Sequence, residues 1–297
     1  MDIPHADLTV DKELAERLVA AQFPELAGPV TLVSQGWDNA LFRLGDDLAI
    51  RMPRREVASH LIEHEQRCLP VLQRLVALPL PVPVAAGRPS ADFPFAWSVI
   101  PWIAGSSGAH LTPADRDAYA RPLAEFFAGL HAPASPDAPH NPVRGVPLDT
   151  RTTAVHARLE GLGGRLAGHE LARLRATWDV GAAAPAYEGP ALWLHGDPHP
   201  GNVVVADSGA LATVVDFGDV TAGDPATDLA AAWLHFTATG RAEFRGRYSA
   251  LHETDAATWQ RARAWAVSIG TSAFAASDGS GLMARMGRDA IAQVLLD

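Results

Sequence analysis

Cysteine, lysine and long apolar runs are scarce in this chain of 297 residues. Cys68 is the only cysteine, which excludes an internal disulfide framework and a cysteine-based zinc site. No apolar run reaches the roughly 18 residues of a membrane helix. The longest candidate, residues 75–87, is interrupted by prolines. The first residues lack a basic stretch followed by an apolar one, so we predict no secretory signal, no membrane partner and a cytoplasmic location.

Basic residues are also in the minority. Asp and Glu outnumber Lys and Arg by 34 to 24, which gives a net charge of −10. Proteins that bind nucleic acid need clustered basic residues to neutralise phosphates, so this balance argues against a nucleic-acid partner. It is compatible with a cationic small substrate. Lys12 is the only lysine, so any role that lysine usually plays must fall to arginine.

The first third of the chain is predicted to be rich in strands. Apolar and polar residues alternate in short segments, and these segments are separated by residues typical of turns. One helix is expected over residues 57–69. Pro70, which follows, either ends this helix or begins a second short one. A first helix at 11–21 and strands at 30–34, 40–44, 48–52 and 97–100 complete this part.

From Thr112 onward the apolar residues recur at helical spacing. Thr112 suits the N-cap of a helix, and Pro113 suits its first position. Further expectations are a loop over 132–149, helices over 152–178 and from 225 onward, and a hairpin turn at 207–209. We therefore predict an α+β chain of two domains, a sheet-rich lobe over residues 1–103 and a mainly helical lobe over 104–297.

Two short motifs carry the chemistry. Residues 195–202 read His-Gly-Asp-Pro-His-Pro-Gly-Asn, and residues 216–219 read Asp-Phe-Gly-Asp after an expected hairpin. Phosphoryl transfer needs a carboxylate that orients and deprotonates the attacking hydroxyl, and oxygen ligands that hold Mg²⁺ against the nucleotide phosphates. Asp197 can supply the first, while Asn202 and Asp216 can supply the others. The hairpin between the motifs would bring Asn202 and Asp216 together at its open end.

Two other classes of enzyme share parts of these motifs. A protein kinase would have Arg where Gly196 stands and a longer activation segment after Asp216. A metallohydrolase could use His195, Asp197 and His199 as zinc ligands, although the sequence offers no second histidine cluster of suitable spacing. The phosphotransferase interpretation uses more of the pattern than either of these.

Together the motifs resemble those of the aminoglycoside phosphotransferase family, whose members are small-molecule kinases with a bilobal, protein-kinase-like fold. The resemblance extends from about residue 30 to residue 233. It implies that Asp197 is the catalytic base and that Asn202 and Asp216 are the Mg²⁺ ligands. It also implies that His195 supports the catalytic loop and that Asp228 accepts hydrogen bonds from the backbone of this loop.

The resemblance also implies a nucleotide-binding set in the first lobe. Its members are Arg51, which would bind the nucleotide phosphates, and Glu65, which would pair with Arg51. Gly36 and Asn39 would lie in the loop over the nucleotide, and the Pro101 carbonyl and Ile103 N–H would read the base. Arg51 stands where the family usually has lysine. Glu63 is an alternative partner for Arg51, and Arg54 and Arg55 are alternative phosphate ligands.

The acceptor is less defined by the sequence. Acidic candidates for its binding are Asp219, Glu253, Asp255 and Asp278, each of which could instead be a solvated surface charge. We predict transfer of the γ-phosphoryl group of ATP or GTP to a hydroxyl of an aminoglycoside or similar antibiotic. The alternative acceptor is a metabolite such as an amino sugar, choline or homoserine. We expect a monomer or a homodimer.

Overall fold

The computed structural model describes residues 5–277 and 279–297. The chain divides into two compact units, which we describe separately. The N-terminal unit contains the described residues up to Arg74 together with Pro79–Ala104, and the C-terminal unit contains Leu75–Leu78 and Gly105–Asp297. Within the described residues, no helix combines the length and apolar character needed to span a membrane.

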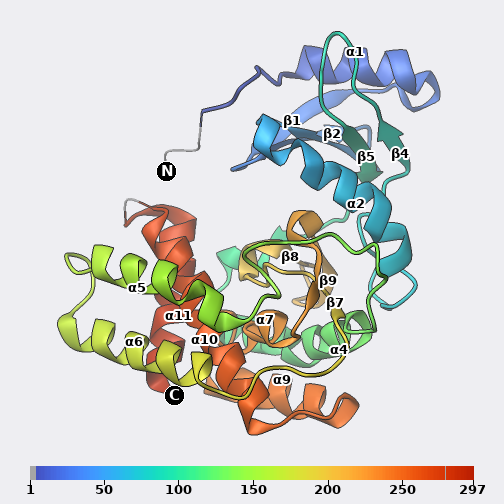
Figure 1. The fold of residues 1–297 in the computed structure, drawn as a ribbon. Helices are drawn as coiled ribbons and strands as arrows, with labels where there is room; N and C mark the ends of the chain where they lie inside the picture. Colours follow the sequence, from blue (N-terminus) through green and yellow to red (C-terminus); the bar gives the residue numbers. More distant parts are fainter. Residues whose placement is uncertain (1–4, 278) are drawn as a thin grey trace. The chain divides into compact units, whose positions relative to one another are not determined.

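The N-terminal unit is built on a five-stranded antiparallel sheet in the order β1-β2-β3-β5-β4. Helix α1 packs on this sheet through Leu14, Leu18 and Val19, so that one apolar core joins α1 to β1, β2, β3 and β5. Figure 1 shows α1 and α2 beside the strands. The elements are α1 (Lys12–Gln22), β1 (Val30–Gln35), β2 (Asn39–Leu44), β3 (Leu48–Pro53), α2 (Ser59–Leu72), β4 (Ala85–Gly87) and β5 (Trp97–Pro101).

Helix α2 differs from the expectation at its C-terminal end. It continues through Pro70 to Leu72 instead of ending at the proline. Pro70 cannot donate a hydrogen bond to the preceding turn. However, Leu69 and Leu72 are almost fully buried, and their packing holds the last residues of the helix in place. Tertiary packing therefore outweighs the local preference of proline.

The C-terminal unit is mainly helical. Helix α10 is buried along most of its length and packs against α6, α7 and α11. A two-stranded sheet, β7 with β10, and a three-stranded sheet in the order β6-β8-β9 lie within this unit. The elements are β6 (Ser106–Ser107), α3 (Pro113–Arg116), α4 (Ala120–Leu130), α5 (Thr152–Gly161), α6 (Gly168–Ala182), β7 (Leu192–Leu194), β8 (Val203–Val205), β9 (Leu211–Val214), β10 (Thr221–Gly223), α7 (Ala226–Leu229), α8 (Ala231–Leu234), α9 (Ala238–Leu251), α10 (Ala256–Ala275) and α11 (Gly281–Leu296).

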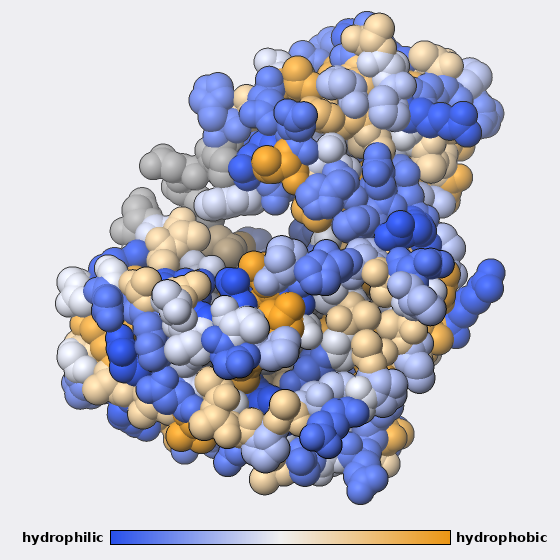
Figure 2. Space-filling model, in the orientation of Figure 1, coloured by the Kyte–Doolittle hydropathy of each residue, from blue (hydrophilic) through white to orange (hydrophobic). Residues whose placement is uncertain are grey.

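Several predicted features of this unit are confirmed. Thr112 caps α3 in a capping box with Asp115, and Pro113 is the first residue of the helix. The hairpin of β8 and β9 turns at Gly209, which has a positive φ of 84°. Figure 2 shows hydrophilic residues over most of the visible surface of each unit, with apolar residues scattered among them.

Candidate active site

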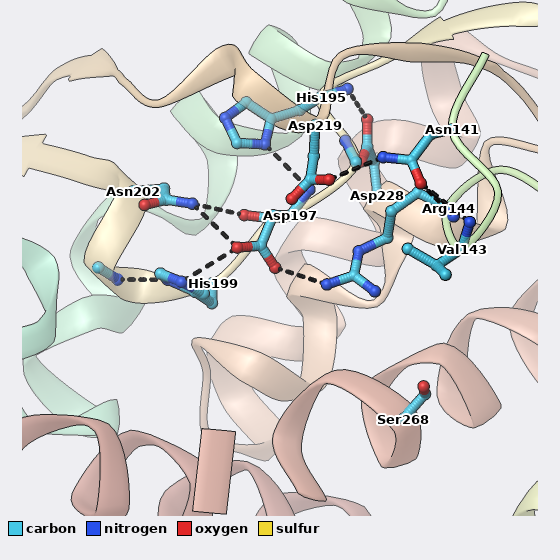
Figure 3. A network of polar contacts seen from close by, with 12 residues as sticks. Asn141, Val143, Arg144, His195, Asp197, His199, Asn202, Asp219, Asp228 and Ser268 are labelled. Atoms are coloured by element: carbon cyan, nitrogen blue, oxygen red, sulfur yellow. Dashed lines mark hydrogen bonds and ion pairs between the residues drawn. The ribbon is translucent and has the colours of Figure 1, made fainter. Parts of the chain in front are cut away.

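The two motifs are brought together by the two strand pairs. Residues 195–202 connect β7 to β8, and residues 215–220 connect β9 to β10. Leu194 pairs with Thr221, and Val203 pairs with Val214. The N–H of Val215 also donates to the carbonyl oxygen of Asn202 at 2.8 Å. Because both connections are tied at both ends, their polar residues are held at one place in the C-terminal unit (Figure 3).

Asp197 lies at the centre of this network. Its Oδ1 is 3.3 Å from Nη2 of Arg144, and its Oδ2 is 3.2 Å from Nε2 of His199. The amide nitrogen of Asn202 donates to the backbone carbonyl of Asp197 at 2.9 Å and faces Oδ2 at 3.4 Å. Burial alone would raise the pKa of Asp197, but His199 and then Arg144 outweigh it and lower this pKa. The side chain is therefore an ionised carboxylate, a group that can accept the proton of a hydroxyl.

Asp228 holds the backbone of the loop that carries Asp197. This fully buried carboxylate accepts hydrogen bonds from the N–H groups of His195 at 2.7 Å and Gly196 at 2.9 Å. His131 approaches its Oδ2 at 3.2 Å. Gly196 has a φ of 90°, and a Cβ at this position would lie 2.3 Å from the carbonyl oxygen of Asp219. Glycine is therefore required where a protein kinase would have arginine.

Asp216 has an unusual backbone conformation. It is the one non-glycine residue with a positive φ, 62°, in the described part of the chain. A left-handed conformation costs an aspartate on the order of 1 kcal/mol and is often found at functional sites. Burial lowers the pKa of His199 and raises the pKa of Asp219, and the charges of Asp197 and, to a smaller extent, Asp216 raise both. Asp216 thus lies in the same electrostatic environment as Asp197.

The donor set fits Mg²⁺. The amide nitrogen of Asn202 is directed to Asp197, which turns the amide oxygen of Asn202 away from this carboxylate. An amide oxygen and a carboxylate are ligands that Mg²⁺ accepts, with water and phosphate oxygens completing its shell. Within the described residues, no three His, Cys, Asp or Glu side chains are arranged to hold a metal by themselves. A sparse site of this kind suits Mg²⁺ bound together with a nucleotide.

The two histidines do not form a zinc site with Asp197. His195 donates from Nε2 to the carbonyl of Val215 at 2.9 Å, and its Nδ1 accepts the N–H of Asp197 at 3.2 Å. His199 uses Nδ1 to accept the N–H of Gly201 at 3.0 Å and Nε2 to contact Asp197. Since the protein engages both ring nitrogens of each histidine, the arrangement expected of a metallohydrolase is not present.

The N-terminal unit contains the expected basic pair. Nε of Arg51 on β3 lies 3.0 Å from Oε2 of Glu65 on α2. Glu65 is 5% exposed, whereas Glu63 is exposed to solvent, so the structure selects Glu65 as the partner. An arginine in this position presents several N–H donors in a fixed plane, which suits phosphate oxygens.

The loop between β1 and β2 is braced by two neighbouring arginines. Arg54 donates from Nη1 to the carbonyl of Gly36 at 2.9 Å, and Arg55 forms an ion pair with Asp38 at 3.0 Å. The N–H of Gly36 donates to the carbonyl of Asn39 at 2.8 Å. Arg54 and Arg55 therefore shape this loop, which leaves Arg51 as the better candidate for a phosphate ligand.

The connection after β5 exposes backbone groups on one edge. The N–H of Trp102 donates to the carbonyl of Asp47 at 2.7 Å. Pro101 pairs with Leu48 in the adjacent position of the antiparallel ladder. Hydrogen-bonded and non-hydrogen-bonded pairs alternate along an antiparallel ladder, so the pair of Pro101 and Leu48 is a non-hydrogen-bonded one. The Pro101 carbonyl therefore faces away from β3, at a position beyond the end of β4. The role of Ile103 stays a prediction.

Of the acidic acceptor candidates that the structure describes, only Asp219 is near Asp197. Asp219 is close to it, since burial and the charge of Asp197 raise the pKa of Asp219. Asp255 instead caps α10, where it accepts hydrogen bonds from N and Oγ1 of Thr258, both at 2.7 Å. Glu253 is exposed in the turn before this cap, and Asp278 lies outside the described residues. The structure therefore favours helix capping, and not acceptor binding, as the role of Asp255.

Sequence reasoning missed Arg144 and Asn141. Arg144 is 53 positions before Asp197, in the proline-rich loop that precedes α5. Asn141 donates from Nδ2 to Asp219 at 2.7 Å and accepts the N–H groups of Val143 and Arg144. This part of the sequence has no periodicity, so no local signal could have linked it to the site.

One unit has a five-stranded sheet with an Arg–Glu pair, and the other has an Asp–Asn–Asp set at the ends of two strand pairs. These features define a kinase-like phosphotransferase. The model of the phosphotransferase enzyme family matches residues 29–265, and the chain belongs to this family. It is therefore an enzyme that transfers phosphate to hydroxyl groups. None of the curated proteins matches the sequence.

Solved structures with the same fold include several antibiotic phosphotransferases. The GDP complex of aminoglycoside 2′-phosphotransferase-IIIa has 18% identity and a TM-score of 0.70, over 97% of this chain and 99% of that one. A GDP and kanamycin complex of a 2″-phosphotransferase has 20% identity and a TM-score of 0.66, over 94% and 95%. A macrolide 2′-phosphotransferase from Brachybacterium faecium has 20% identity and a TM-score of 0.62, over 94% and 98%.

Proposed function

We propose that this chain is a small-molecule kinase that transfers the γ-phosphoryl group of ATP or GTP to a hydroxyl of its acceptor. The observation that carries this proposal is the convergence of Asp197, Asn202 and Asp216 at the ends of two strand pairs, with the loop held by Asp228. Phosphoryl transfer requires positioning and electrostatic stabilisation more than covalent chemistry. A rigid set of oxygen ligands beside an ionised carboxylate meets this requirement.

In the proposed mechanism Asp197 orients the acceptor hydroxyl and takes its proton. The hydroxyl oxygen forms a bond to the γ-phosphorus while the bond from this phosphorus to the β-γ bridging oxygen breaks, which leaves a nucleoside diphosphate. Asn202 and Asp216 would hold Mg²⁺, which neutralises charge on the phosphates. Asp228 and Gly196 keep the loop in the conformation that presents Asp197.

For the nucleotide we propose the residues of the N-terminal unit. Arg51, oriented by Glu65, would bind phosphate oxygens, and the braced loop with Gly36 and Asn39 would cover them. The Pro101 carbonyl and the Ile103 N–H would bind the edge of the base. Solved relatives are complexes with GDP and with ATP, so both donors should be compared.

For the acceptor, hydroxylated antibiotics are the first class to test. The solved relatives include complexes with kanamycin, streptomycin and gentamicin, together with a macrolide phosphotransferase. Aminoglycosides and macrolides are therefore candidate acceptors for this chain, and hydroxylated metabolites are the acceptors to test against them.

The test is nucleotide turnover by the purified protein with ATP and GTP in parallel, across aminoglycosides, macrolides, peptide antibiotics and amino sugars. We expect turnover that requires Mg²⁺ and rises when the acceptor is present. Removal of Mg²⁺ with a chelator should abolish it, and added Mg²⁺ should restore it. Failure to bind either nucleotide in the presence of Mg²⁺ would refute the proposal.

A further inference from the structure

Three arginines are grouped in one segment of the C-terminal unit, and one of them, Arg144, contacts the proposed catalytic carboxylate. Arg144 lies in the loop before α5, Arg151 directly precedes α5, and Arg158 is within it. Burial, and then the charges of Arg144 and Arg151, lower the pKa of Arg158. The guanidinium of Arg158 is therefore influenced by the charges of both other arginines.

Carboxylates compensate little of this charge. Arg144 is paired with Asp197, while Arg151 and Arg158 form no ion pair with the described residues. Arg158 donates to the Ser268 carbonyl at 2.8 Å and lies 3.4 Å from Oγ1 of Thr271. The Nε atoms of Arg144 and Arg151 are buried and have no hydrogen-bond partner among the described residues. Buried, uncompensated donors of this kind are costly unless an acceptor meets them.

Arg144 contacts a different oxygen of Asp197 from the one that the proposed metal ligand Asn202 faces. It contacts Oδ1, whereas His199 and the amide of Asn202 contact Oδ2 (Figure 3). An acceptor hydroxyl must reach Asp197 without displacing the metal-binding side, so it must come from the side of Arg144. Asp219, the other carboxylate near Arg144, is already bound by the amide of Asn141 at 2.7 Å.

We propose that Arg144, with Arg151 and Arg158 adding positive charge from the same segment, binds an anionic group on the acceptor, such as a carboxylate or a phosphate ester. The guanidinium of Arg144 would exchange its contact with Asp197 for this group, which frees Oδ1 for the hydroxyl. This inference rests on the proposed function and narrows it, because it requires an acceptor that carries an anionic group near the reacting hydroxyl.

The test is calorimetric titration with malonate, a small dicarboxylate, into protein saturated with ADP and Mg²⁺ to occupy the nucleotide site. Wild-type protein should bind malonate, and Arg144→Gln should weaken the binding at least about tenfold, as expected for loss of a charge-assisted hydrogen bond. Arg144→Lys should restore part of it. Arg175→Gln is the matched control, because Arg175 is 41% exposed and pairs with Glu160.

Equal binding of malonate by wild type and Arg144→Gln, or no binding by either, would overturn the inference. A second arm compares glucuronate, glucose and glucosamine as ligands of the same complex, and tighter binding of glucosamine would also overturn it. The proposed function fails separately, if the protein does not bind ADP with Mg²⁺ at the start. Thermal unfolding of each variant checks that Arg144→Gln remains folded.

Discussion

The catalytic connections at residues 195–202 and 215–220 differ sharply from the arginine-bearing segment at 144–158. In the first, strand pairing and the buried Asp228 fix the backbone, and Asp197 is flanked by compensating partners. In the second, like charges gather and two buried Nε donors lack partners. The comparison teaches that the proposed catalytic carboxylate lies in a fixed and charge-compensated setting, whereas the segment at 144–158 contains buried donors that an acceptor group would satisfy under our proposal.

The largest effect is expected at Asp197. Asp197→Asn removes the proton acceptor and should lower acceptor-dependent turnover by about a thousandfold with every acceptor, the range found for general bases. Steady-state kinetics with a saturating acceptor measures it. Asp207→Asn, in the exposed turn of the β8–β9 hairpin, is the matched control and should keep full turnover. Wild-type rates in Asp197→Asn would remove this residue from the role of base.

Substitution of Asp228 tests whether this buried carboxylate holds the backbone of residues 195–202 in place. Asp228→Ala leaves two backbone N–H groups and His131 without their buried acceptor. It should destabilise the protein by about 3 kcal/mol, because broken buried charge networks cost this much, and turnover should fall with it. Thermal unfolding and kinetics together measure the effect. Asp228→Asn keeps one acceptor and should be intermediate; unchanged unfolding in Asp228→Ala would contradict the anchoring role.

These contacts also explain how far the sequence could predict the molecule. Asp197, Asn202 and Asp216 are linked by a short loop and one hairpin, so their spacing along the chain determines their meeting in space. Arg144 meets Asp197 across 53 positions through an irregular loop, which leaves no pattern to read. Pro70 was expected to interrupt α2, but the burial of Leu69 and Leu72 depends on packing that only the folded unit provides.

Arg51 extends the comparison to the N-terminal unit. Arg51→Ala should raise KM for the nucleotide about tenfold, because a charge-assisted contact with phosphate is lost. Arg51→Lys keeps the charge but not the planar set of donors, so a smaller increase is expected. Initial rates at varied nucleotide and fixed acceptor separate KM from kcat. An unchanged KM in Arg51→Ala would exclude Arg51 as a phosphate ligand.

The smallest effect concerns pH and a histidine under the catalytic loop. Burial and the charge of Arg116 hold the pKa of His235 well below its ordinary value of 6.5. Its ring contacts Tyr119 and the carbonyl of Pro198. As the pH falls through about 6.5, His235 takes up a proton in the unfolded chain but not in the native state. The stability that neutral His235 contributes is therefore present above this pH and is lost as the pH falls.

Tm should therefore fall between about pH 7 and about pH 5, and His235→Gln should reduce the slope of this fall even if it lowers Tm at neutral pH. His5→Gln, at an exposed position, should leave the slope unchanged. The same slope in His235→Gln and wild type would show that His235 does not titrate on unfolding.

The most direct test of the central claim is transfer of label from γ-³²P nucleotide to the acceptor that gives the highest turnover. We predict that label reaches this acceptor when Mg²⁺ is present, and that Asp197→Asn, Asn202→Ala and Asp216→Asn each reduce the transfer to near background while the protein stays folded. Undiminished transfer in folded Asp216→Asn, or transfer that does not require Mg²⁺, would contradict the account.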